Sequence, residues 1–138
     1  MINYVVEGVS LPNLDYDKLN RWIEMVASSF GLNVGSLTYC FCDDKYILDV
    51  NRRFLNHDYY TDIITFDYTR SDKIGGDMVI SLDTVRSNAE QLGADFTKEL
   101  LRVIIDGVLH LCGIDDKGPG EREIMEQEEN KALSLYEF

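Results

Sequence analysis

Hydrophobic positions along the chain switch between the spacing of strands and that of helices. Residues 2–6 are rich in β-branched and aromatic side chains, which predicts a first strand. Apolar residues then recur every three or four positions, which predicts a helix that Asp15 or Asp17 caps and Gly31 ends. Its apolar stripe consists of Leu19, Trp22, Ile23, Val26, Ala27 and Phe30. We expect this stripe to face the core.

The middle of the chain predicts three more strands and a short helix. Apolar side chains dominate both faces of residues 36–42, which is typical of a buried strand, and a short helix is expected over 44–55. Residues 61–68 and 76–81 predict two further strands. A polar turn ending at Gly75 joins them, so we expect a hairpin.

The last third of the chain predicts three helices. The first is expected over 83–92. A longer helix is expected over 96–112, with Asp95 as its N-terminal cap and Gly113 as the left-handed residue after its end. The last begins after the Gly-Pro-Gly sequence at 118–120.

The order βαβαββααα predicts an α+β (mixed α/β) fold. We expect one mixed sheet of about four strands, covered by helices, with at least one parallel crossover pair among the early strands. The 138 residues, 45% hydrophobic and 28% charged, suit a single domain that spans residues 1–138. No segment has the length of a membrane span or the pattern of a signal peptide, so we expect a cytoplasmic protein without a membrane partner.

The net charge bears on whether the protein binds nucleic acid, and the cysteine content bears on whether it forms disulfides. The chain carries 13 basic and 25 acidic residues, a net charge of −12, which repels phosphate-rich polymers and attracts cations. Composition alone therefore favours neither RNA nor DNA as a partner. The 3 cysteines are an odd number without the spacing of a disulfide framework, which predicts reduced thiols.

The helix expected over 96–112 is apolar nearly all round, but it carries Asp106 and His110. Residues four apart lie on the same face of a helix, about one turn from each other. The turn at Gly113 returns Asp116 toward them, so these three side chains can converge on one divalent ion. An alternative is that Asp106 and His110 form a buried ion pair and Asp116 belongs to an ordinary polar turn.

Residues 105–116 read Ile-Asp-Gly-Val-Leu-His-Leu-Cys-Gly-Ile-Asp-Asp and resemble the signature of the YbeY family of endoribonucleases. The family motif is His-Gly-x-Leu-His-Leu-x-Gly-Tyr-Asp-His, whose three histidines bind zinc. Two further blocks resemble family motifs in the same order: Asn51 and Asp58 with Thr61–Phe66, and Gly76–Ile80. The residues that match the signature are Gly107, Leu109, His110, Leu111, Gly113 and Asp115.

The metal ligands depart from the family pattern. Asp106 and Asp116 stand where the family has its first and third histidines, and only His110 is retained. Two carboxylates would neutralise the ion and leave it a weaker Lewis acid, with a less acidic bound water. The resemblance implies zinc as the cofactor, whereas a histidine with two carboxylates favours a harder ion such as manganese.

The resemblance implies a single-strand-specific, metal-dependent endoribonuclease of rRNA maturation, including processing of the 16S rRNA 3′ end, and of ribosome quality control. His110 and Asp116 are then catalytic, and the partners are rRNA, the small ribosomal subunit and ribosomal or GTPase assembly proteins. Leu55 stands where the family has an arginine, so we expect Arg52 and Arg53 to contact RNA phosphates. Asp77 and Asp115 are candidates for a general base.

Two other functions remain open. The strong negative charge and the altered ligand set favour a ribosome-assembly binding factor without catalysis, whose metal site is vestigial. The third hypothesis is a metallopeptidase, because a helix with a His-x-x-x-His motif is also typical of that class. It ranks last, since no glutamate beside His110 is available as the base.

Overall fold

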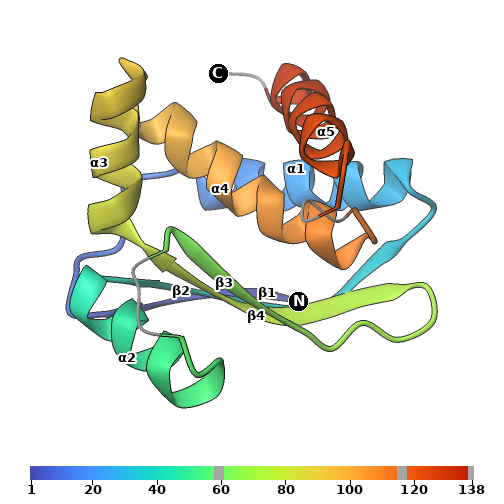
Figure 1. Ribbon diagram of the computed structural model, residues 1–138. Helices are drawn as coiled ribbons and strands as arrows, with labels where there is room; N and C mark the ends of the chain where they lie inside the picture. The colour runs from blue at the N-terminus through green and yellow to red at the C-terminus, as the bar shows by residue number, and fades with distance from the viewer. Residues whose placement is uncertain (58–60, 115–117, 137–138) are drawn as a thin grey trace.

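The computed structural model describes residues 1–57, 61–114 and 118–136 (Figure 1). It confirms the predicted order of elements and the α+β fold with one four-stranded mixed sheet. The elements are β1 (Ile2–Glu7), α1 (Tyr16–Ser29), β2 (Asn33–Cys42), α2 (Asp44–Phe54), β3 (Ile63–Asp67), β4 (Lys73–Ser81), α3 (Leu82–Leu92), α4 (Phe96–Leu111) and α5 (Glu121–Leu135). Over the described residues, no helix is both long and apolar enough to cross a membrane.

The strands lie in the order β1-β2-β4-β3. The pairs β1–β2 and β2–β4 are parallel, whereas β3 and β4 form the predicted antiparallel hairpin. One row of paired residues therefore runs across the sheet through Tyr4, Tyr39, Met78 and Thr65. The two edge strands are β1 and β3, and the candidate site lies at the β3 edge.

The hairpin turn is shorter than the sequence predicted. Arg70 and Lys73 already form a bridge across it, and Ser71 adopts a left-handed backbone with φ of 53°. The expected end of the turn at Gly75 was wrong, because Gly75 and Gly76 are buried inside β4. A Cβ on Gly76 would lie 2.4 Å from the Phe66 carbonyl oxygen, so a residue without a side chain is required where β3 and β4 approach most closely.

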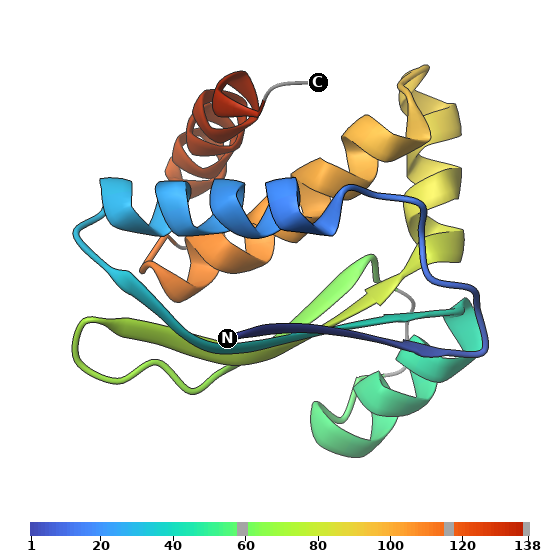
Figure 2. The same ribbon diagram turned by 180° about the vertical axis from the view of Figure 1, so that it is seen from behind.

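Helices cover the two faces of the sheet unequally. Figure 1 and the reverse view in Figure 2 show α1, α3, α4 and α5 on one face and α2 alone on the other. The face under α4 holds the main core, and α2 covers a second, smaller core. The smaller core consists of Cys42, Ile47, Val50, Ile64 and Val79.

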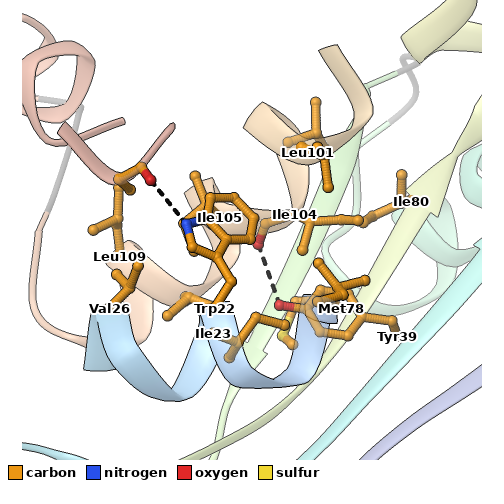
Figure 3. Packing of buried hydrophobic residues seen from close by; sticks show 14 of the residues in the cluster. Trp22, Ile23, Val26, Tyr39, Met78, Ile80, Leu101, Ile104, Ile105 and Leu109 are labelled. Atoms are coloured by element: carbon orange, nitrogen blue, oxygen red, sulfur yellow. Dashed lines mark hydrogen bonds between the residues drawn. The ribbon is translucent and has the colours of Figure 1, made fainter. Parts of the chain in front are cut away.

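α4 lies at the centre of the main core, as its apolar sequence predicted. Its Leu101, Ile104 and Ile105 have no exposed surface. Two long-range hydrogen bonds fix the surrounding elements (Figure 3): the Tyr39 hydroxyl donates to the Ile104 carbonyl at 3.2 Å, and the Trp22 indole N–H donates to the Ala132 carbonyl at 2.8 Å. These bonds hold α4 against β2, and α5 against α1.

The helix ends follow the predicted capping chemistry. Of the two candidates for the α1 cap, Asp15 is the one whose side chain accepts a hydrogen bond, from the Lys18 N–H. Asp95 caps α4 in the same way. After α4, Gly113 adopts φ of 100°, a conformation that favours glycine and lets the chain turn sharply.

All three cysteines are free thiols, as the sequence predicted. Burial raises the pKa of the Cys42 thiol to about 12 and that of Cys112 to about 11. Both thiols therefore remain protonated at neutral pH, which makes them poor nucleophiles.

Candidate functional site

The candidate site is an open cavity of about 390 Å³ at the β3 edge of the sheet. Its walls come from the end of α2 and the following turn, from the segment that leads into β3, and from α4. The lining residues are Asn51, Leu55, His57, Thr61, Asp62, Ile63, Ile64, Thr65, Asp106 and His110.

Asp106 and His110 line this cavity together, as their helical spacing predicted. Both are partly exposed, whereas Ile105 and Leu109 beside them are buried against the core. This polar part of α4 therefore opens onto the cavity. Partial exposure lowers the desolvation cost of polar side chains on an otherwise buried helix.

Gly107 sets how closely α4 approaches the sheet. A Cβ on this residue would lie 2.9 Å from the Met78 Cγ and 3.1 Å from the Ile63 Cδ1. Met78 is fully buried and Ile63 is partly buried against the main core, so neither side chain can easily move aside. A larger residue at position 107 would therefore push α4 away from β3 and β4. Gly107 thereby fixes the distance from Asp106 and His110 to β3.

The turn after α2 brings a second histidine into the cavity. The Asn51 carbonyl accepts hydrogen bonds from the backbone N–H groups of Leu55 and His57, each at 3.1 Å. Asn56 between them adopts a left-handed backbone with φ of 56°, which lets the chain fold back. His57 therefore reaches the cavity although it is far from His110 in sequence.

Sequence reasoning gave no role to His57 or Asp62. Asp62 belongs to the Thr61–Phe66 block that resembles a family motif, and this block was the only signal that pointed to it. His57 carried no such signal beyond being one of 2 histidines in the chain. Asn56 just after the helix expected over 44–55 is a local signal for a left-handed turn, but which residues His57 then meets depends on tertiary packing.

The third predicted metal ligand, Asp116, lies outside the described residues, as does Asp115. The site with Asp106, His110 and Asp116 together therefore stays a prediction. Among residues 1–57, 61–114 and 118–136, no group of three or more His, Cys, Asp or Glu side chains is arranged to hold a metal ion.

Arg52 and Arg53 face away from the cavity. Arg52 lines a separate hollow with Glu7 and other acidic residues, and the Arg53 Nε lies 3.2 Å from an Asp49 carboxylate oxygen on the solvent side of α2. The helical spacing explains this, because Asn51 and Leu55 are four apart and occupy the face toward the cavity. Contact of either arginine with RNA stays a prediction.

Asp77 also lies away from the cavity. This candidate base is exposed on β4 and lines a hollow with Cys40 and Phe66, beside α2. The side chains of Ile63 and Thr65, in contrast, lie against Gly107 of α4 on the other face of the sheet. Asp77 is therefore separated from Asp106 and His110 by the sheet itself.

The charges around the cavity are mainly acidic. Asp62 and Asp106 contribute carboxylates, and the described lining residues include no lysine or arginine. Burial raises the pKa of the neighbouring Glu99, and the charge of Asp62 raises it further, although Arg102 lowers it. A carboxylate and an imidazole that open onto one cavity are suitable ligands for a divalent transition metal, so these two side chains fit the implied ion as part of its ligand set.

The fold and the site together define an α+β domain whose central helix presents a carboxylate and an imidazole at the edge of a mixed sheet. The family model described as Endoribonuclease YbeY matches residues 8–137. The chain therefore belongs to the YbeY endoribonuclease family.

Relatives of known name agree with this assignment over nearly the whole chain. A protein from Bacteroides thetaiotaomicron named Endoribonuclease YbeY is 58% identical over 97% of this chain and 98% of its own length. A protein of the same name from Phocaeicola vulgatus is 61% identical over 98% of each chain. The solution structure of TM1509 from Thermotoga maritima has a similar fold, with a TM-score of 0.69 and 24% identity over 97% of this chain and 90% of that one.

Proposed function

We propose that this protein is a metal-dependent endoribonuclease that hydrolyses phosphodiester bonds of single-stranded RNA in the cavity beside β3. The observation that carries the proposal is that Asp106 and His110 open onto one cavity, in a chain whose family and named relatives are endoribonucleases.

Asp106 and His110 would hold the divalent ion, and the sequence supplies Asp116 as the third ligand. When bound, such an ion acts as a Lewis acid toward a phosphoryl oxygen and lowers the pKa of a coordinated water. Zinc is the ion that the family resemblance implies. The two carboxylates shift the preference of the site toward a harder ion such as manganese.

His57 would act on the substrate from the opposite wall. It comes from the α2 side of the sheet, whereas Asp106 and His110 come from the α4 side. A phosphodiester between these walls would meet an imidazole that can donate a hydrogen bond or a proton to an oxygen. We assign His57 the role of the acid that assists the leaving oxygen.

The biological substrate in this proposal is rRNA, with maturation of the 16S rRNA 3′ end and ribosome quality control as the processes. The small ribosomal subunit and ribosomal or GTPase assembly proteins are the proposed partners, in the cytoplasm. These assignments rest on the resemblance of the sequence motifs to the family.

Cleavage of an end-labelled single-stranded rRNA fragment, with manganese or zinc added, tests the enzymatic activity. We expect cleavage by the wild-type protein, loss of cleavage in His110→Ala, and retention in Asp77→Asn, whose exposed side chain lies across the sheet from the cavity. Cleavage that survives both a chelator and His110→Ala would contradict the proposal.

The second candidate is a non-catalytic binding factor of ribosome assembly. The observation that favours it is the ligand set, because Asp106 and Asp116 replace two histidines of the family motif. In that case the wild-type protein and His110→Ala would bind the small ribosomal subunit equally, and neither would cleave RNA. The same pair of proteins therefore separates the two functions.

A further inference from the structure

The cavity does not lie on either face of the sheet but across the outer edge of β3. Its lining includes Asp106 and His110 of α4, which covers one face, and Asn51 of α2, which covers the other (Figures 1 and 2). It also includes the consecutive residues Ile63 and Ile64, whose side chains point to opposite faces of a strand. Only space beyond the edge strand can be reached from both faces.

The backbone of β3 points polar groups into this space. The Ser81 N–H bonds to the Asp62 carbonyl, and the Tyr68 N–H bonds to the Gly75 carbonyl. Hydrogen-bonded pairs alternate along an antiparallel ladder, so the even-numbered residues of β3 bond to β4. The N–H and C=O groups of Ile63 and Thr65 therefore point outward, and in the described part of the chain β3 pairs with β4 alone.

Among the described residues, the charged side chains of the cavity do not provide hydrogen-bond donors for phosphate oxygens, so backbone N–H groups matter there. The described lining residues carry two carboxylates and no lysine or arginine, and Arg52 and Arg53 lie elsewhere. Away from the proposed divalent ion, the carboxylate of Asp62 would repel a phosphate, and no described lysine or arginine of the lining offsets this repulsion, so neutral donors are the favourable partners there. Backbone N–H groups at the edge of a sheet form anion-binding sites and are frequent partners of nucleic-acid phosphates.

We infer that the outer edge of β3 binds the substrate backbone, with the Thr65 N–H donating a hydrogen bond to a phosphate oxygen of the RNA strand. The inference rests on the proposed function, and it adds a substrate-binding group that belongs to the main chain. The RNA strand then lies along β3, between α4 and the turn that carries His57.

Amide hydrogen exchange, measured by NMR, tests this contact without changing β3. We use the full-length His110→Ala protein, in which the proposed function expects no cleavage, with and without a short single-stranded RNA. The Thr65 amide should exchange rapidly alone and become protected with RNA. Asp67 provides an internal control, because its N–H also points outward from β3 but it does not line the cavity. Its exchange should not change.

A backbone substitution provides the second test. Thr65→Pro removes the outward N–H but no hydrogen bond to β4, and proline is tolerated at such edge positions. We expect RNA binding, measured by fluorescence anisotropy in the same His110→Ala background, to weaken about tenfold or more. Asp67→Pro removes an outward N–H of β3 outside the cavity and should not weaken RNA binding.

The outcomes separate this inference from the proposed function. If the wild-type protein cleaves RNA but the Thr65 amide stays unprotected, or Thr65→Pro binds RNA as tightly as the parent protein, the edge contact is wrong and the function stands. If the protein neither binds nor cleaves RNA, both are wrong. If Thr65→Pro does not fold, the exchange of the Thr65 amide decides alone.

Discussion

The Tyr39 hydroxyl on β2 donates a hydrogen bond to the carbonyl of Ile104, two residues before Asp106 on α4 (Figure 3). Tyr39 has no exposed surface, and its ring lies in a stack with Tyr4 at a centroid distance of 5.6 Å. The helix that carries the candidate ligands is thus attached to a central strand of the sheet. This hydrogen bond is one of the contacts, together with the packing of Gly107, that hold the helix of the candidate site on the sheet.

Removal of this hydroxyl should lower stability without abolishing the site. Tyr39→Phe keeps the ring and its stacking, so we expect the free energy of unfolding to fall by about 1 kcal/mol. Urea denaturation followed by the fluorescence of Trp22 measures this change. RNA cleavage should remain within about threefold of wild type, because Gly107 still holds α4 against β3. A complete loss of folding in Tyr39→Phe would show that this hydrogen bond contributes far more than about 1 kcal/mol to the free energy of unfolding.

Gly107→Ala should reduce both stability and activity. The added Cβ meets Met78 and Ile63, which should lower the free energy of unfolding by about 1–3 kcal/mol and move Asp106 and His110 away from β3. Gly93→Ala is the matched control. Its left-handed φ of 64° makes alanine unfavourable by about 1 kcal/mol, but nothing lies within 4 Å of the added Cβ and Gly93 does not line the cavity.

Both variants are to be compared by urea denaturation and by RNA cleavage under conditions where each is folded. We expect the Gly107 variant to lose activity beyond its loss of folded protein, and the Gly93 variant to lose none. Equal activity per folded molecule in the two variants would contradict the positioning role of Gly107.

Glu129 on α5 should make stability depend on pH. Its side chain is nearly fully buried, and the Glu129 Oε1 lies 3.0 Å from the Arg102 Nη1. Burial raises the pKa of Glu129 despite the hydrogen bond and charge of Arg102. A carboxyl whose pKa is higher in the folded state contributes stability at low pH, and this contribution is lost as the pH rises through the folded pKa.

Glu129→Gln should therefore gain stability relative to wild type as the pH rises from mildly acidic to neutral values. Urea denaturation of both proteins across this range measures the difference. Glu123→Gln is the control, since Glu123 is exposed on the same helix and is not among the charges that act on the pKa of Glu129. If the difference between Glu129→Gln and wild type does not change with pH, the buried carboxyl does not titrate as we infer.

Asp106→His should raise the affinity for zinc. The variant exchanges a carboxylate for a neutral imidazole, a ligand better suited to zinc than to harder ions. Competition with a chromophoric chelator measures zinc affinity, with His110→Ala as the variant expected to lose it. A variant that no longer folds would instead indicate that Asp106 belongs to a structural ion pair.

The local sequence determined the elements and several of their ends, although not the end of the turn between β3 and β4. The apolar spacing of α1 and α4, the aspartate caps and the glycine after α4 each depend on residues within a few positions of one another. The shared face of Asp106 and His110 follows from helix geometry in the same way. Family membership could also be predicted, because the motifs keep their order and spacing over most of the chain.

Only the tertiary structure decided where the candidate site lies. The strand order β1-β2-β4-β3 leaves β3 at an edge, and that edge is what allows α4 and the turn after α2 to meet in one cavity. The packing of α2 against the sheet decides that His57 lines the cavity and that Arg52 lines a separate hollow. Such placements arise from contacts between segments far apart in sequence, which a local pattern of hydrophobic and polar residues cannot encode.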